Sequence, residues 1–233
     1  MKKVLVILLL LLTSCVNSSF QQKSVFFRGT FLKIEKRIML SACSPINQKQ
    51  CMTRTYESSA SSFLIKSTAK KSYLLTAAHV CSNDFGNLVF LPKFKASVQF
   101  YGLDANMERH DYQVVLIDVK NDLCVVSTKR MTGKMPYKLA WRYPELGGQV
   151  YNIAAPMGIY EKNIKLLFTG LFSGSAYDRA VFTLPAAGGS SGSPILDQHG
   201  QVVGLVSAVT TNFKNIVISP TLKDIRQIVN TIK

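Results

Sequence analysis

The chain has 233 residues, of which 47% are hydrophobic, so it can bury a substantial core and is not a disordered tail. Its 28 Lys and Arg against 13 Asp and Glu give a formal net charge of +15, which favours contact with anionic surfaces. The basic residues lie in small, dispersed groups such as Lys36-Arg37 and Lys129-Arg130, and the sequence contains no nucleic-acid motif. Nucleic-acid binding is therefore not indicated.

Residues 1–14 have the composition of an export signal. Lys2 and Lys3 precede an apolar run over residues 4–12, which is too short to span a bilayer as a helix. The sequence Leu12-Thr13-Ser14-Cys15 resembles a bacterial lipobox, in which the chain is cut before the Cys and the new terminal thiol is lipidated. The alternative is an ordinary cleaved signal that contains a Cys. Both predict a mature protein outside the cytoplasm, and a cut before Cys15 would lower the formal charge by the two lysines, from +15 to +13.

Residues 15–24 are rich in Ser, Asn and Gln and predict a short tether, followed by a folded domain over residues 25–233. Within that domain, short apolar or alternating runs separated by Gly, Pro, Asn and Asp predict an all-β structure. The predicted strands are Phe63–Ile65, Tyr73–Thr76, Val98–Tyr101, Gln113–Val119, Leu123–Ser127, Val150–Ala154, Leu166–Leu171, Ala180–Leu184 and Gln201–Val209.

One helix is predicted, over residues 219–232 at the C-terminus. Ser219 can cap it with Pro220 at the first position, and an apolar stripe recurs at helical spacing. The stripe consists of Leu222, Ile225, Ile228, Val229 and Ile232. We expect it to dock on the β-structure, the alternative being a helix that contacts a membrane or a partner.

The segment Gly188-Gly189-Ser190-Ser191-Gly192-Ser193-Pro194 lies between two predicted strands. A serine hydroxyl that attacks an amide carbonyl needs backbone N–H groups aimed at the developing oxyanion, and a nearby glycine allows close approach of the substrate. Ser191 is then a candidate nucleophile, and the amides of Gly189 and Ser191 form a candidate oxyanion hole. Taken alone, the segment is equally compatible with a Gly/Ser turn between strands.

Two further segments supply a candidate base and a candidate acid. In Tyr73-Leu74-Leu75-Thr76-Ala77-Ala78-His79, an apolar strand leads into a histidine flanked by small residues, which leave room for a general base. In Asn121-Asp122-Leu123, a carboxylate opens an apolar strand and can orient the imidazole. Asp118 is the rival acid. Because it falls inside the preceding predicted strand, we favour Asp122.

Together these segments resemble the trypsin-like (chymotrypsin-fold) serine peptidases, and more closely their bacterial branch of HtrA-type proteases and glutamyl endopeptidases. The order His, Asp, Ser agrees, and coverage extends from about Ser61 to the C-terminal helix, including Ser61-Ser62-Phe63-Leu64-Ile65. The resemblance implies two packed six-stranded antiparallel β-barrels, over about residues 25–140 and 141–218, followed by the helix. The implied activity is cleavage of protein or peptide substrates through an acyl-enzyme, with His79 as base, Asp122 as its orienter and Ser191 as nucleophile, and with no metal or cofactor.

Removing Cys15 leaves four cysteines, for which an oxidising compartment makes disulfides the default expectation. Three pairings are possible, and we favour Cys43 with Cys51 and Cys81 with Cys124. The second pair follows from the triad, because Cys81 lies two residues after His79 and Cys124 two residues after Asp122. The alternative for Cys81 and Cys124 is that both are buried small hydrophobic residues.

Several positions depart from the family pattern. Ser190 stands where the animal digestive members have an Asp that pairs with a new N-terminus, so we expect no activation of that kind. Pro185 stands where enzymes that cut after Arg or Lys carry an acid, and Ala186 stands where glutamyl endopeptidases carry a hydroxyl. We therefore expect a small or apolar P1 residue. The rival function is a catalytically inactive, protease-like binding protein of the cell envelope that uses its basic surface.

Overall fold

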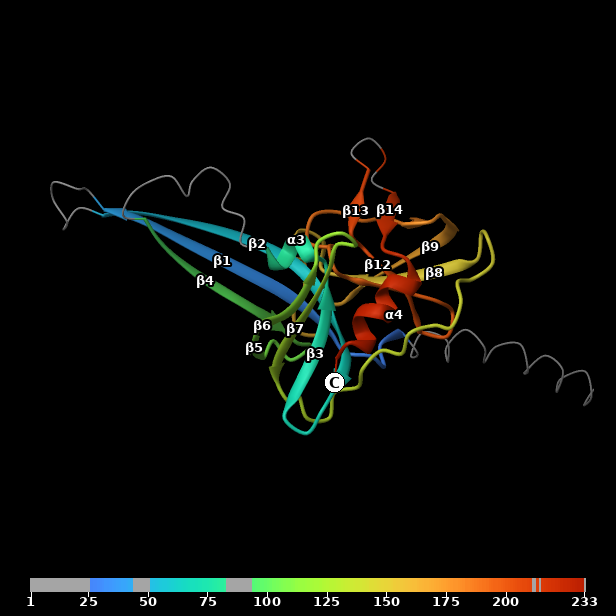
Figure 1. Ribbon diagram of the computed structural model, residues 1–233, viewed down its shortest axis with the longest axis horizontal. Helices are drawn as coiled ribbons and strands as arrows, with labels where there is room; N and C mark the ends of the chain where they lie inside the picture. Colours follow the sequence, from blue (N-terminus) through green and yellow to red (C-terminus); the bar gives the residue numbers. More distant parts are fainter. Residues whose placement is uncertain (1–25, 44–50, 83–93, 211–212, 214, 233) are drawn as a thin grey trace, which may run out of the picture.

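A computed structural model describes residues 26–43, 51–82, 94–210, 213 and 215–232 (Figure 1). The predicted signal peptide, the lipidation candidate Cys15 and the predicted tether lie outside the described residues. No helix within these ranges is both long and apolar enough to cross a membrane.

The first half of the described chain forms one seven-stranded antiparallel sheet, in the order β5-β4-β1-β2-β3-β7-β6. A four-residue helix, α3 (Ala78–Cys81), follows β3 directly. The strands are β1 (Phe31–Cys43), β2 (Cys51–Ser67), β3 (Lys71–Thr76), β4 (Phe94–Leu103), β5 (Arg109–Asp111), β6 (Gln113–Asp118) and β7 (Leu123–Lys129).

The second half forms another seven-stranded antiparallel sheet, in the order β12-β11-β8-β9-β10-β14-β13. A short 3-10 turn, η2 (Pro156–Gly158), follows β8. The strands are β8 (Gln149–Ala154), β9 (Leu166–Ser175), β10 (Ala180–Thr183), β11 (Pro194–Leu196), β12 (Val202–Leu205), β13 (Ala208–Val209) and β14 (Ile216–Ser219). The two curled sheets pack side by side, and the all-β architecture is confirmed.

Each sheet has seven strands where the prediction had six. Strands as short as β5 and β13 carry too little alternation to be recognised, and β5 contains only the polar residues Arg109, His110 and Asp111. The predicted run Gln201–Val209 is also two strands rather than one, because the chain leaves the sheet between Leu205 and Ala208.

Strands β1, β2 and β4 extend well beyond the rest of their sheet and form a three-stranded arm, at the left of Figure 1. The register of β1 against β2 is unbroken from the pair Phe31–Phe63 to the pair Cys43–Cys51. The first eight residues of β2 are all exposed. The arm therefore places a long stretch of sheet outside the core.

The core has two clusters of buried apolar side chains. One fills the first sheet and reaches onto β8, β12 and the C-terminal helix, and the other fills the second sheet. The helix α4 (Leu222–Asn230) packs against β12 and β7, and Leu222, Ile225 and Ile228 are buried. The expectation that this stripe docks on the β-structure is thus met.

The predicted start of the helix was wrong. Thr221, not Ser219, is the N-cap, and its hydroxyl accepts a hydrogen bond from the amide of Asp224 at 3.1 Å. Ser219 ends β14, where its hydroxyl accepts from the amide of Leu205 and donates to the carbonyl of Pro220. A hydroxyl already engaged with a neighbouring strand is not available to cap the helix.

Candidate active site

His79 is carried by α3, directly after the buried strand β3. Ala77 and Ala78 are buried, which fixes the backbone before the histidine, whereas half of the His79 side chain is exposed. The other end of α3 is held by the buried Lys36, whose ammonium donates to the carbonyl of Val80 at 3.1 Å and to that of Ser82. The buried residues before His79 and the Lys36 ammonium at the last carbonyls of α3 therefore hold the accessible imidazole in position.

Asp122 lies in the turn between β6 and β7, where it has a left-handed φ of 51°. Its carboxylate accepts a hydrogen bond from the backbone N–H of His79 at 2.9 Å, and its two oxygens lie 3.0 and 3.1 Å from His79 Nδ1. A proton on Nδ1 satisfies this contact and leaves Nε2 with a free lone pair. The imidazole is then oriented to accept a proton at Nε2.

The rival carboxylate, Asp118, accepts hydrogen bonds within the turn between β6 and β7 instead. One of its oxygens accepts from the amide N–H of Asn121 at 3.1 Å and the other from the Asn121 side chain at 2.7 Å. Asp118 therefore stabilises the turn that presents Asp122, and of these two acids only Asp122 contacts His79.

Ser207 is a further partner of Asp122 that was not recognised from the sequence. Its hydroxyl donates to Asp122 Oδ2 at 2.5 Å, from the segment between β12 and β13. Burial by itself would raise the pKa of Asp122, but the hydrogen bonds from His79 and Ser207 outweigh it and hold the pKa below its ordinary value. The carboxylate is therefore ionised at neutral pH, as an orienter of a histidine requires.

A disulfide joins Cys81 at the end of α3 to Cys124 at the start of β7. This is the pair expected from the sequence, and it ties the segments that carry His79 and Asp122 together. Cys43 lies opposite Cys51 in the register of β1 and β2. Because the side chain of Cys43 lies outside the described residues, that pairing stays a prediction.

The loop around Ser191 leaves two backbone N–H groups unused. The amides of Ser190, Gly192 and Ser193 donate to the carbonyls of Ala187, Val206 and Ser190, respectively. Within the described residues, the amides of Gly189 and Ser191 donate to nothing. Two free amides at these positions, with Gly189 at a φ of 92°, are the donors that an oxyanion hole would require.

Two residues of the first sheet support this loop of the second half. The amide of Ser61 on β2 donates to the carbonyl of Ser191 at 2.8 Å, and the Ser61 hydroxyl donates to the carbonyl of Gly189 at 2.8 Å. Gly192 packs so closely on Thr76 that a Cβ there would lie 2.2 Å from the Thr76 hydroxyl. Because Thr76 lies three residues before His79, these contacts bring Ser191 to the same end of the molecule as His79.

Ser191 itself is partly accessible, and its hydroxyl makes no hydrogen bond to any described residue. Ser190 is buried, and its hydroxyl accepts from the amide of Ala187 at 3.3 Å, inside the same loop. Hydrogen bonds between nucleophile and base are often long in the resting state and tighten when substrate binds.

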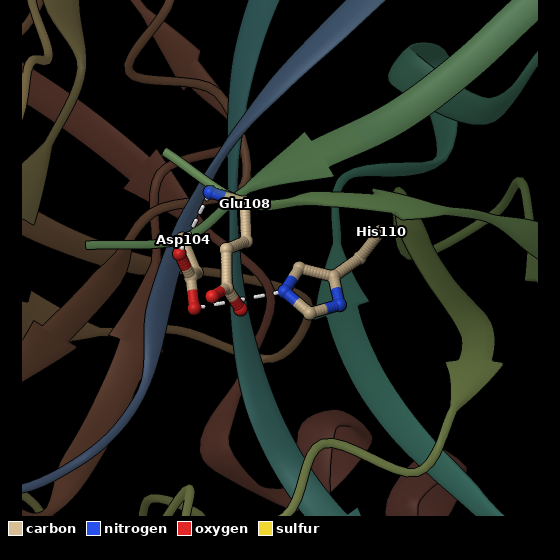
Figure 2. A group of neighbouring side chains, drawn as sticks. All are labelled: Asp104, Glu108 and His110. Carbon is tan, nitrogen blue, oxygen red and sulfur yellow. Dashed lines mark hydrogen bonds and ion pairs between the residues drawn. The ribbon is translucent and has the colours of Figure 1, made fainter. Parts of the chain in front are cut away.

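One group of metal-ligand residue types exists among the described residues, formed by Asp104, Glu108 and His110 at the turn between β4 and β5 (Figure 2). Asp104 is fully buried, and the ammonium of Lys134 lies 2.6 Å from its Oδ2. Its other oxygen accepts from the amides of Asn106 and Glu108. The carboxylate is thus already paired with a cation and with the turn, so this group is explained as a structural ion pair.

The trypsin-like peptidase domain family matches residues 60–205, which is well over half of the chain. The chain belongs to this family. It has the chymotrypsin-like fold. The family match supports a hydrolase of the serine protease class that acts on proteins or peptides. The matched span contains His79, Asp122, Ser191 and the supporting Ser61.

Solved structures agree on the fold. The Rv3671c protease of M. tuberculosis in its active form matches with a TM-score of 0.60 and 14% identity, over 91% of this chain and 83% of that one. Its inactive form matches with a TM-score of 0.58 and 16% identity, over 84% and 85%. A serine endoprotease from Yersinia pestis matches with a TM-score of 0.63 and 14% identity, over 93% and 67%. No curated protein matches by sequence.

Proposed function

We propose that the chain is an exported serine endopeptidase with His79, Asp122 and Ser191 as its catalytic triad. Ser191 Oγ attacks the scissile carbonyl while His79 Nε2 takes its proton, and the amides of Gly189 and Ser191 bind the oxyanion. The protonated His79 then gives that proton to the leaving amine, and water hydrolyses the acyl-enzyme by the same route.

One observation carries the proposal. An ionised carboxylate holds His79 through both its backbone N–H and its Nδ1, in the same part of the molecule as Ser191, whose own amide and that of Gly189 donate to no described residue. A Gly/Ser turn that only connected strands would have no need of free amides beside an accessible hydroxyl.

The experiment is labelling with a fluorophosphonate probe together with peptide hydrolysis. We expect Ser191→Ala to abolish labelling and to lower kcat by several orders of magnitude. Ser173→Ala removes an exposed hydroxyl that bonds only Thr183, so it is the matched control and should label like the wild type. A native protein that is stable but neither labels nor hydrolyses peptides would instead be the protease-like binding protein.

A small or apolar P1 preference is part of the proposal. Pro185 and Ala186, which lie between β10 and the Ser191 loop, offer no charge to a basic side chain and no hydroxyl to an acidic one. Cleavage of a peptide library should therefore concentrate after small or apolar residues. A profile dominated by Arg, Lys or Glu would contradict this preference.

Export of the protein with a lipid on Cys15 is the remaining part of the proposal. The proposal of an envelope enzyme anchored to a membrane is supported by the two lysines, the apolar run and the Leu12-Thr13-Ser14-Cys15 sequence. Mass spectrometry of the exported protein should find Cys15 as a lipidated N-terminus. An unmodified N-terminus at another residue would indicate an ordinary secreted form.

A further inference from the structure

A surface hollow lies at the opposite end of β3 from His79. It has a volume of about 490 Å³ and is lined by residues of β5, the start of β6, the start of β3 and the end of β7. β3 runs from Lys71, beside the hollow, to Thr76, over about 20 Å at ~3.4 Å per residue. Figure 1 shows α3 and the β2–β3 turn at opposite ends of this strand. The hollow is therefore separate from the proposed active site.

The charged side chains around the hollow are mainly cationic. Of the described residues, Lys70, Lys71, Arg109 and Lys129 line it together with one carboxylate, Asp111. That carboxylate is already paired with Arg109 at 2.8 Å. Within the described part of the chain, the three lysines form no ion pair. The hollow thus holds an excess of positive charge that the protein itself does not neutralise.

Two of these lysines are direct cross-strand neighbours. Lys71 on β3 lies opposite Lys129 on β7 in the antiparallel register, so both side chains project from the same face of the sheet. Like charges in this position repel each other and destabilise the pairing of the strands. An anion between the two ammonium groups would remove this repulsion, so the arrangement indicates a negatively charged ligand.

Ser127 adds a neutral hydroxyl to the same hollow. It lies two residues before Lys129 on β7, so its side chain projects from the same face of the sheet as those of the two lysines. Ser127 is 1% exposed, yet its hydroxyl forms no hydrogen bond with any described residue. Buried polar groups in proteins normally have a partner. This hydroxyl is therefore available to donate to an oxygen of a bound anion.

The proposed lipid anchor holds the folded domain close to a membrane. The described chain starts at Phe26, whose carbonyl accepts a hydrogen bond from the Tyr137 hydroxyl at 3.0 Å. Eleven residues separate Phe26 from Cys15, and they can reach at most about 40 Å when fully extended. A lipid on Cys15 would keep the domain at the membrane surface, but a tether of this length does not fix which face of the domain meets the membrane.

We propose that the cationic hollow binds the phosphate groups of anionic phospholipids and so sets the orientation of the domain on the membrane. The anion site follows from the hollow itself, whereas the choice of a membrane as its source rests on the proposed lipid at Cys15. Each Lys or Arg near an anionic surface strengthens binding by about fivefold, so several in one hollow give a reversible contact. With the hollow on the membrane, the other end of β3 and the proposed active site face away from the bilayer.

The first test measures binding to vesicles by co-sedimentation. It uses the chain from residue 15 onward with Cys15→Ser, which carries no lipid, so that any binding comes from the protein surface. We expect this protein to bind vesicles made of equal parts of phosphatidylglycerol and phosphatidylcholine, and not vesicles of phosphatidylcholine alone. Binding should be lost as the NaCl concentration rises from about 0.1 M to about 1 M, because salt screens exposed charges.

The second test removes the cross-strand pair of charges. We expect Lys71→Gln combined with Lys129→Gln to weaken binding to the anionic vesicles by about 25-fold, since each lost charge near the surface weakens it about fivefold. Lys162→Gln combined with Lys223→Gln is the matched control. It removes the same net charge from two exposed lysines of the second half of the chain, and it should leave the affinity nearly unchanged.

The third test locates the contact on the unaltered domain by hydrogen exchange. On anionic vesicles, backbone amides of the β2–β3 turn at residues 68–71 and of the end of β7 at residues 127–130 should exchange more slowly than in solution. Amides of residues 188–193, around Ser191, should exchange at the same rate in both conditions. Slower exchange around Ser191 instead would show that the active-site end contacts the membrane, which contradicts the proposal.

The remaining outcomes also decide the matter. The proposal is overturned by a lack of binding to anionic vesicles, or by an equal loss of affinity in the two double variants, which would mean that only net charge matters. Release from the vesicles by inorganic phosphate at the concentration of the lipid phosphate would show that a free anion is the ligand. Tighter binding to an oligonucleotide would show a nucleic-acid site, and either result overturns a membrane contact.

These tests are independent of the proposed peptidase. Vesicle binding by a protein that hydrolyses no peptide supports the hollow and overturns the peptidase, whereas hydrolysis without vesicle binding does the reverse. The lipid on Cys15 is tested separately by mass spectrometry, so its absence can be distinguished from a failure of the hollow to bind.

Discussion

Asp122 contributes to stability as well as to the proposed chemistry. Its pKa is lowered in the folded state by the bonds from His79 and Ser207. A carboxyl group with a depressed folded pKa stabilises the protein above its unfolded pKa of about 3.9, and this stabilisation is lost as the pH falls through the folded value. The contacts that orient His79 are therefore weakest in acid.

We predict that Ser207→Ala lowers the free energy of unfolding at pH 7 by about 1–2 kcal/mol, because it removes a donor from an ionised acceptor. The difference from the wild type should shrink as the pH falls below about 4 and through the lowered pKa of folded Asp122. Urea unfolding at pH 7 and pH 3 measures this. Ser67→Ala is the control, since it removes a neutral bond to the Ser72 hydroxyl, and its effect should not depend on pH. A constant difference for Ser207→Ala would contradict the assignment.

At the scale of single residues, the candidate triad could be predicted because each member lies beside a recognisable segment. His79 follows an apolar strand, and Ser191 lies in a glycine-rich loop. Ser207 and Ser61 have no such signal, because their partners are 85 residues away at Asp122 and 128 residues away at Gly189. A hydroxyl becomes a positioning group only through the fold that brings its partner near.

At the scale of elements, the Cys81–Cys124 disulfide fastens α3 to β7 across a separation of 43 residues. We predict that the double variant Cys81→Ala, Cys124→Ala loses about 3–4 kcal/mol of unfolding free energy, since closing a loop of this length restricts the unfolded chain. Both sulfurs are buried, so the small cavity adds to the loss. The disulfide also holds His79 near Asp122. We therefore expect kcat of the double variant to fall by a larger factor than its KM changes. A loss below about 1 kcal/mol in denaturant unfolding would show that the strands hold α3 without the disulfide.

The outer half of β2 was missed for a physical reason. All residues of β2 from Cys51 to Ser58 are exposed, so residues such as Thr53, Arg54 and Thr55 show no alternation between apolar and polar. Periodicity reveals a strand only where one face is buried. By contrast, β3 and β7 are buried, and their boundaries agree closely with the predicted runs.

At the scale of the whole molecule, the proposed site exists only where the two sheets meet. His79 and Asp122 belong to the first sheet and Ser191 to the second, so their relative placement depends on contacts between the halves. Ser61 supplies three of them, because besides Ser191 and Gly189 it bonds the second half through Ala155, whose amide donates to its hydroxyl at 3.2 Å. This side chain couples the position of the proposed oxyanion loop to the sheet that carries His79.

We predict that Ser61→Ala lowers kcat by about tenfold or more, since the Gly189 carbonyl loses its donor and the amide that should face the oxyanion is no longer fixed. The adjacent Ser62→Ala is the matched control. Ser62 is equally buried, but its hydroxyl bonds Leu32 and Tyr112, both within the first half of the chain. Each variant should lose about 1–3 kcal/mol of stability for the buried groups left unpaired, while only Ser61→Ala should lose kcat and fluorophosphonate reactivity. Equal loss of activity in both variants, measured where both are fully folded, would mean that Ser61 only stabilises the fold and does not position the oxyanion loop.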